Sequence, residues 1–205
     1  MTRFDELVRC SSGHEAIAFA LGAELGAAPP DGADELLAGL AARLDARPDD
    51  PVAELGAVAA VVRETFEVRP APVLLPQVLG RGGGDPDSLT ILGAIVAQRA
   101  GLDVDVVSDG DRLYLAHTRL GPPFVADVTR ADPLFDGTSL GGDLAWQCGH
   151  ETAYATLRRV ARSSATTGDL ATELAALALI LLLPLAPNSR NAYEAHHKQL
   201  LARLN

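Results

Sequence analysis

Two places in this 205-residue chain set a thiol and an imidazole close together in sequence. Cys148 and His150 are separated by one residue, so both side chains could reach one metal ion from an extended loop. A zinc site, however, uses three or four protein ligands, and this spacing supplies two. We therefore expect no metal and no cofactor, and we interpret Cys148 as a loop residue packed beside Trp146.

The other histidines give equally weak signals. Cys10 and His14 lie four residues apart, which places them on one face of a helix, but Gly13 weakens a helix there. This segment is best interpreted as an N-terminal cap. His196 and His197 are adjacent, so on a helix their side chains point about 100° apart, which favours a surface position.

A glycine-rich segment, Gly80-Arg81-Gly82-Gly83-Gly84, stands in the middle of the chain. A phosphate-binding loop would continue with Gly-Lys-Ser/Thr, and no lysine follows here, so we expect a flexible turn. The turn opens an apolar helix that runs to Gly101. Enzymes often keep a nucleophile at such a helix start, yet residues 85–92 contain no cysteine.

The spacing of apolar residues predicts the elements around this helix. Residues 15–25 and 34–44 have helical periodicity, and Asp50-Pro51 is the cap-then-proline order expected at the start of a third helix over residues 52–66. The first third of the chain is therefore expected to be a helical layer.

After Gly101 the pattern alternates as in strands. Residues 104–107 and 112–117 read as a hairpin joined by Asp109-Gly110, and residues 122–128 read as a third strand. Helical patterns then return over residues 143–163, 167–183 and 191–204. The predicted fold class is α+β, with a central helix on a short antiparallel sheet. We divide the chain into a helical region (1–68), a core (69–140) and C-terminal helices (141–205), which together are expected to form one compact unit.

Composition narrows the range of partners. Seventeen Lys and Arg against 27 Asp and Glu give a formal net charge of −10, which disfavours a nucleic-acid partner. The longest apolar run, residues 174–186, is broken by Pro184 and is shorter than the roughly 20 residues that cross a bilayer, so no membrane partner is expected. The first residues lack a signal-peptide pattern and the two cysteines read as free thiols, so we expect a cytoplasmic protein.

Several short motifs, in order, resemble the bacterial SirB-type transglutaminase-like family. They are Glu15-Ala16-Ile17-Ala18, Gly84-x-Pro86-x-Ser88-Leu89, Arg99-Ala100-Gly101-Leu102, Gly168-Asp169-Leu170 and Leu185-Ala186-Pro187-Asn188. The resemblance spans nearly the whole chain. It implies a transglutaminase-like (papain-like) core and a tail of degenerate tetratricopeptide-like helices.

An active member of this fold is expected to carry a cysteine at the start of the central helix, then a histidine and an aspartate on the next two strands. In this chain the cysteine position falls near Pro86, with Ser88 as the closest hydroxyl, and the histidine position falls on Asp111. Only Asp127 matches its expected residue type. The resemblance therefore implies a cleft at Ser88, Asp111 and Asp127 that lacks the thiol and the imidazole.

Two other arrangements of these residues deserve a test. Asp111 and Asp127, on adjacent strands, could form a carboxylate pair that shifts a pKa or holds a cation, and alternation would point Arg112 to the opposite face. His117 could join Ser88 and Asp127 in a hydrolase triad, although it lies six residues from Asp111, about 20 Å along an extended strand.

Two functions of different classes follow. The favoured one is a non-catalytic protein whose cleft and terminal helices bind a partner protein or a small ligand. The alternative is an acyltransferase or amide hydrolase with a relocated active site drawn from Ser88, Asp111, His117 and Asp127.

Overall fold

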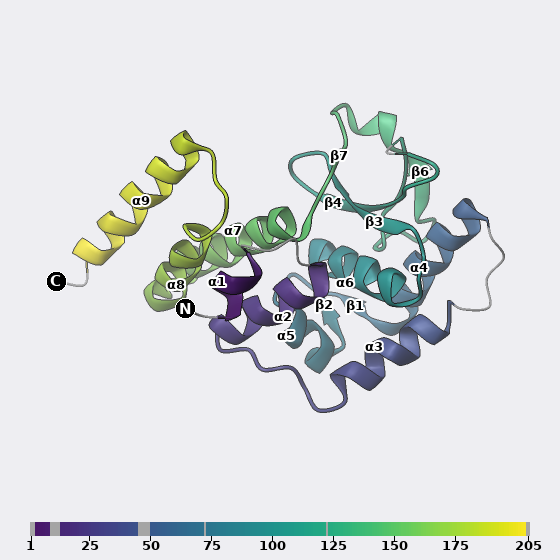
Figure 1. Cartoon of the computed structure of the whole chain (residues 1–205), viewed down its shortest axis with the longest axis horizontal. Coiled ribbons are helices and arrows are strands. Elements are labelled where there is room, and N and C mark those ends of the chain that lie inside the picture. The colour runs from purple at the N-terminus through teal and green to yellow at the C-terminus, as the bar shows by residue number, and fades with distance from the viewer. Residues whose placement is uncertain (1–2, 9–12, 45–49, 72, 122, 204–205) are drawn as a thin grey trace. The chain divides into compact units, whose positions relative to one another are not determined.

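A computed structural model of the chain describes residues 3–8, 13–44, 50–71, 73–121 and 123–203. It is a mixed α+β protein, which confirms the predicted class (Figure 1). The chain forms two compact units. The helical unit comprises Met1–Ala27 and Gly149–Asn205, and the sheet unit comprises Ala28–Cys148.

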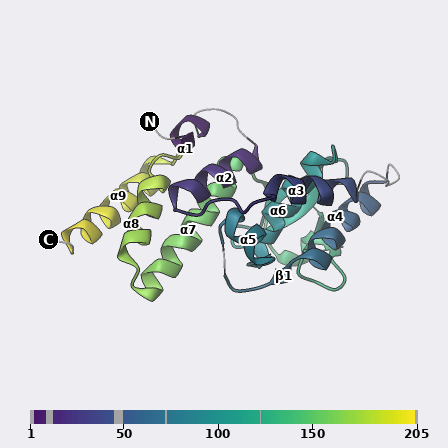
Figure 2. The same cartoon turned by 90° about the horizontal axis from the view of Figure 1, so that it is seen from below.

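The helical unit joins the two ends of the chain. Its helices are α1 (Arg3–Leu7), α2 (His14–Glu24), α7 (Gly149–Thr167), α8 (Leu170–Ile180) and α9 (Pro187–Ala202). α2 and α8 both pack against α7, and α9 packs against α8 (Figure 2). The helices at the two ends of the chain, which were expected in the separate ranges 1–68 and 141–205, belong to one unit, and the expected core range 69–140 lies within the other.

The sheet unit places its helices around one central helix. They are α3 (Ala33–Ala42), α4 (Pro51–Thr65), α5 (Leu75–Arg81) and α6 (Pro86–Arg99). α3 and α4 match the helices predicted at 34–44 and 52–66, and α6 is the predicted central helix. Every residue of α6 from Asp87 to Ala97 is buried, so this helix forms the centre of the unit.

The main sheet has the order β6-β5-β4-β3-β7 and is antiparallel throughout. Its strands are β3 (Val104–Ser108), β4 (Leu113–His117), β5 (Phe124–Ala126), β6 (Leu134–Asp136) and β7 (Ala145–Trp146). The predicted hairpin over residues 104–117 is confirmed. A separate two-stranded sheet pairs β1 (Glu67–Val68) with β2 (Gly83–Gly84).

Both faces of the central strands are buried, whereas antiparallel sheets often leave one face to water. α6 packs on β3 and β4, so closely that an added Cβ at Gly93 would lie 2.9 Å from Leu115 Cδ1. On the other face, Tyr114 and Val125 pack with side chains that follow β5, namely Phe135, Leu140 and Leu144.

One predicted helix boundary is wrong. A helix was expected from residue 143, but residues 145–146 form β7 instead, and α7 begins only at Gly149. β7 pairs Trp146 with Val107, which satisfies backbone groups along the outer side of β3. The glycine-rich segment, expected to be a flexible turn, instead contains the end of helix α5 and the strand β2.

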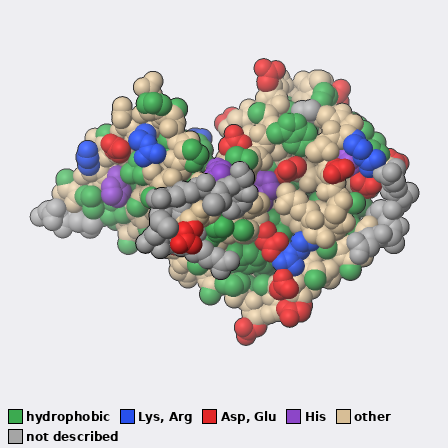
Figure 3. All heavy atoms as spheres, in the orientation of Figure 1, with side chains coloured by type: hydrophobic (Ala, Val, Ile, Leu, Met, Phe, Trp, Pro, Cys, Tyr) green, Lys and Arg blue, Asp and Glu red, His purple; other side chains and the backbone are tan. Residues whose placement is uncertain are grey.

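Acidic side chains are spread over the face of the molecule drawn in Figure 3 and are not gathered into one patch. Within the described residues, no helix combines the length and the apolar content needed to span a membrane.

Candidate functional site

The first turn of α6, where the resemblance expects a nucleophile, begins with a buried cap. Asp85 accepts a hydrogen bond from the Ser88 backbone N–H at 2.9 Å, and Pro86 follows the cap at a position that needs no N–H donor. The Ser88 hydroxyl donates to the Val73 carbonyl at 2.8 Å and lies 3.2 Å from Asp85 Oδ2. Ser88 is only 3% exposed, so its hydroxyl serves the cap and the preceding loop.

Two further side chains fasten this turn to the start of β4. Asp87 Oδ1 accepts the Leu113 backbone N–H at 3.1 Å. The Thr90 hydroxyl lies 3.0 Å from the Pro86 carbonyl and 3.4 Å from the Leu113 carbonyl. The polar side chains of the turn are therefore hydrogen-bonded to backbone N–H and C=O groups, which need such partners when they are buried.

Asp127, which directly follows β5, is 5% exposed, and both of its carboxylate oxygens have partners. Its Oδ1 accepts hydrogen bonds from the Thr129 backbone N–H at 2.9 Å and from the Thr129 hydroxyl at 2.6 Å. Its Oδ2 lies 3.3 Å from Arg112 Nη1. A buried carboxylate is costly without such partners. Here the partners are Arg112 and the turn at Thr129, whereas the family resemblance implies a histidine.

This ion pair corrects the expectation that Arg112 points away from Asp127. The register pairs Leu115 with Ala126, so Tyr114 lies opposite Asp127, and alternation then places Arg112 on the face of Tyr114. The Arg112 guanidinium accordingly lies 5.5 Å from the centre of the Tyr114 ring. Leu115 faces α6, which contains Ser88, so Tyr114 and Asp127 lie on the other side of the sheet. Asp127 and Ser88 also have different bonding partners.

Asp111 lies in the exposed turn between β3 and β4, where its N–H donates to Asp109 Oδ1 at 2.9 Å. Burial alone would raise the pKa of Asp109, but the N–H groups of Arg112 and Asp111 and the Tyr114 hydroxyl outweigh it and lower that pKa. Burial and the negative charge of Asp109 raise the pKa of Tyr114. Among the described residues, Asp109, and not Asp111, joins this turn to the groups around Asp127, since Asp109 accepts hydrogen bonds from the Arg112 backbone N–H and the Tyr114 hydroxyl.

His117 is completely buried at the far end of β4 and has a partner that the sequence analysis missed. Its Nε2 lies 2.9 Å from Glu54 Oε2, and its Nδ1 accepts the Arg119 backbone N–H at 3.1 Å. Because Nδ1 accepts a hydrogen bond, the ring proton is on Nε2, and this N–H donates a hydrogen bond to the Glu54 carboxylate. The Arg119 side chain reaches Glu54 Oε1 at 3.3 Å. Glu54 stands in the otherwise apolar sequence Val52-Ala53-Glu54-Leu55, which was the available sign of a buried charge.

The remaining cysteine and histidine candidates have separate surroundings. Cys148 is exposed, and Trp146, beside which it was expected to pack, is 39% exposed. His150 Nε2 donates to the Val8 carbonyl at 3.0 Å, and His14 Nδ1 lies 3.0 Å from the Thr152 hydroxyl. Cys10 lies outside the described residues. Among the residues that are described, no three His, Cys, Asp or Glu side chains are grouped to hold a metal ion.

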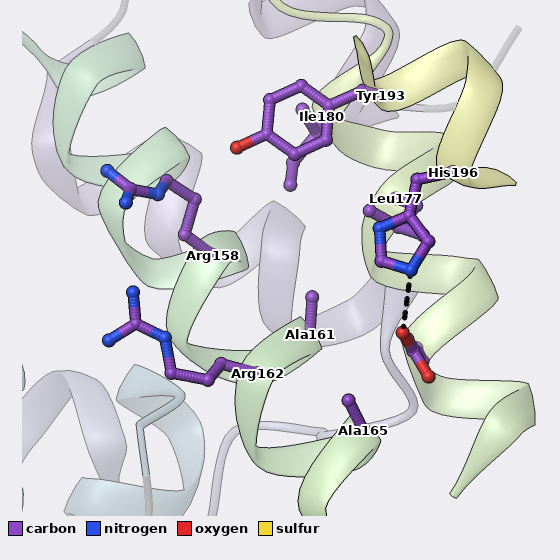
Figure 4. Close-up of a pocket in the computed structure, with 9 residues that line it drawn as sticks. Arg158, Ala161, Arg162, Ala165, Leu177, Ile180, Tyr193 and His196 are labelled. Atoms are coloured by element: carbon purple, nitrogen blue, oxygen red, sulfur yellow. Dashed lines mark ion pairs between the residues drawn. The ribbon is translucent and has the colours of Figure 1, made fainter.

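The helical unit contains a cavity of about 200 Å³ between α7, α8 and α9. His196, expected at the surface, is half exposed, and its Nε2 also lies 3.3 Å from Oε1 of the buried Glu173 (Figure 4). The hydroxyl groups of Tyr154 and Tyr193 are 3.0 Å apart. Burial, followed by this hydrogen bond, raises the pKa of Tyr193 to about 12.

Comparisons of this chain with models of known families, with curated proteins and with solved structures find no match.

Proposed function

We propose that this chain is a non-catalytic protein with a transglutaminase-like core, which binds a partner protein or a small ligand. The core proposal rests on the family resemblance of its motifs and is supported by a central helix packed on an antiparallel hairpin.

One observation carries the non-catalytic part: the polar side chains of the first turn of α6 are bonded to structural groups. Asp85 caps the helix, Ser88 donates to a carbonyl, and Asp87 accepts a strand N–H. A serine nucleophile would instead donate its hydrogen to a base within hydrogen-bond reach.

The groups around Asp127 and His117 support the same conclusion. Arg112, the partner of Asp127, stays protonated in proteins and cannot accept a proton as a general base. Both ring nitrogens of His117 already have partners, and one of these is the buried carboxylate of Glu54. The partners of Asp127 and His117 therefore support a role in stabilising the fold. In an enzyme, the corresponding carboxylate and imidazole would activate a nucleophile.

Rates of hydrolysis and acyl transfer test the proposal. We expect the purified protein to cleave an activated ester and a glutaminyl peptide no faster than a Ser88→Ala, Asp127→Asn double variant whose fold is verified by circular dichroism. Turnover that the double variant loses would replace this proposal with the acyltransferase or amide hydrolase alternative.

The binding part is tested by thermal unfolding in the presence of peptides and small metabolites. A ligand at 100 times its dissociation constant stabilises a protein by about 2.7 kcal/mol and so raises its unfolding temperature by several degrees. A panel that includes short peptides and small acids, none of which shifts the temperature, would count against a binding role.

A further inference from the structure

We propose that the cavity between α7, α8 and α9 binds an apolar group that ends in a carboxylate. This inference rests on the binding role proposed above and assigns it a place and a ligand chemistry. The ligand could be the C-terminal residue of a peptide or a free carboxylic acid, since both present the same groups.

The cationic side of the cavity consists of two arginines one turn apart on α7. Arg158 and Arg162 both line it, and Figure 4 shows their side chains leaving α7 in the same direction. Like charges at this spacing repel each other by a few tenths of a kcal/mol in a free helix. An anion between the two guanidinium groups removes that repulsion and forms charge-assisted hydrogen bonds.

These two arginines differ from several others in this acidic chain. In the sheet unit, Arg43, Arg69 and Arg99 each have a carboxylate partner within 2.7 Å. Over the described residues, neither Arg158 nor Arg162 has a carboxylate partner, although acidic residues outnumber basic ones by 27 to 17. Arg158 instead lies over the Tyr154 ring, 5.6 Å from its centre. Two exposed guanidinium groups thus remain available to an oxyanion.

The rest of the lining selects the kind of anion. Leu177 and Ile180 of α8 are buried apolar side chains that can cover a short hydrocarbon group. Glu173, which is 5% exposed, adds a negative charge that is paired with His196. That charge repels a doubly charged phosphate more than a singly charged carboxylate. An apolar body with one carboxylate therefore fits the cavity better than inorganic phosphate does.

The cavity volume agrees with a ligand of this size. About 200 Å³ is below the 300 to 1,000 Å³ common for drug-sized ligands, so one amino-acid residue or a short acid is the expected occupant. The dissociation constant for such a small ligand is expected at about 0.1 to 1 mM.

Nuclear magnetic resonance titration of the whole chain tests the inference with three probes. They are an acetylated peptide ending in Ala-Leu with a free carboxylate, the same peptide amidated, and 4-methylpentanoate. We expect saturable shifts of α7 and α9 amide signals with the free-acid peptide, with 4-methylpentanoate, or with both, and which of them binds identifies the source. The amidated peptide is expected to bind at least tenfold more weakly.

Substitutions of the lining arginines test whether the ligand binds in this cavity. Arg158→Gln and Arg162→Gln should each raise the dissociation constant about tenfold, since both remove a charge that contacts the carboxylate. Lys198→Gln is the matched control, because Lys198 is an exposed cation of α9 that does not line the cavity. It should leave binding within about twofold of the wild type.

Three results would overturn the inference: no saturable binding of either carboxylate probe at about 10 mM, equal binding of the amidated peptide, or equal loss with Lys198→Gln. None of them would alter the outcome of the Ser88 and Asp127 rate measurements. Conversely, catalysis lost in that double variant would end the non-catalytic proposal without affecting binding in this cavity.

Discussion

At the scale of single residues, two Asp-Pro pairs illustrate how burial changes the contribution of one motif. Asp50 caps α4 and Asp85 caps α6, and each is followed by proline. Asp50 is exposed and, among the residues that the structure describes, accepts hydrogen bonds from backbone N–H groups alone. Asp85 is 7% exposed and also lies within reach of the Ser88 hydroxyl. The same local sequence therefore forms an ordinary cap in one place and part of a buried polar network in the other.

Replacement of these caps by alanine should separate the two cases. Asp85→Ala is expected to lower the free energy of unfolding by about 2 kcal/mol, since it also leaves the buried Ser88 N–H without its acceptor. Asp50→Ala should cost about 0.5 to 1 kcal/mol, because water can solvate the exposed N–H groups it frees. Urea unfolding of both variants measures the difference. Equal costs would show that the Asp85 network adds nothing to simple capping.

At the scale of elements, the packing of α6 on β4 depends on a glycine. An added methyl group at Gly93 would lie 2.9 Å from Leu115 Cδ1 and 3.5 Å from Val62 Cγ2 of α4. All three residues belong to elements that meet at the centre of the sheet unit. A glycine inside a helix is otherwise unfavourable by about 0.5 to 1 kcal/mol relative to alanine. Close approach of α6 to the sheet explains why it is tolerated here.

Two glycine-to-alanine substitutions are expected to have opposite signs. Gly93→Ala should destabilise the protein by about 1 kcal/mol net, because overpacking outweighs the gain in helix propensity. Gly39→Ala, in the exposed part of α3 with no atom within 4 Å of the new methyl group, should stabilise it by about 0.5 to 1 kcal/mol. Thermal unfolding provides the comparison. Stabilisation by both substitutions would mean that Leu115 shifts at little cost.

The attachment of α9 gives a pH-dependent prediction. Burial and the Tyr154 hydrogen bond raise the pKa of Tyr193 to about 12, above the value of 10.0 for a free tyrosine. The unfolded chain therefore loses this proton first as the pH rises. The stabilisation is fully present below about pH 10 and is lost as the pH approaches about 12. Because Tyr193 is partly exposed, the loss should stay below about 2 kcal/mol.

Unfolding at about pH 9 and about pH 11.5 should reveal this effect. The wild type is expected to lose more stability between these conditions than Tyr193→Phe, which has no proton to release. Tyr154→Phe should shift the titration of Tyr193, followed by tyrosinate absorbance, back toward pH 10. A wild type and a Tyr193→Phe variant with the same pH dependence would contradict the assignment.

The sequence predicted the elements that have strong local signals. The helices near residues 34–44 and 52–66 and the hairpin over 104–117 follow from periodicity, an Asp-Pro cap and an Asp-Gly turn. The two-residue strands β1, β2 and β7 could not be predicted in this way, because so short a segment has no period and exists only through its pairing partner.

The surroundings of the candidate site were harder to predict than its elements. The Glu54–His117 contact joins residues far apart in sequence, and no local pattern shows which buried carboxylate meets which imidazole. The Arg112–Asp127 pair depends on strand register, and a shift of one residue changes the face of every side chain. The Ser88 hydroxyl was correctly placed at the start of α6, but its carbonyl partner comes from the preceding loop.

At the scale of the whole molecule, the net charge of −10 sets how salt should affect stability. Surface ion pairs such as Arg43–Glu64 contribute about 0 to 1 kcal/mol each, and salt weakens them. Repulsion among surplus carboxylates acts in the opposite sense, and salt weakens it too. With 27 acidic against 17 basic side chains, and acids spread over the visible face, repulsion should dominate (Figure 3).

Added NaCl is therefore expected to raise the unfolding temperature at neutral pH. Between about 0.01 M and 0.15 M the screening length falls from about 30 Å to about 8 Å, so distant carboxylates cease to repel one another. A triple variant, Asp31→Asn, Asp132→Asn and Asp143→Asn, removes three exposed charges and changes the net charge from −10 to −7. Its unfolding temperature should rise less with salt than that of the wild type. A wild type destabilised by this salt would show that its ion pairs contribute more than the repulsion, despite the excess of acidic residues.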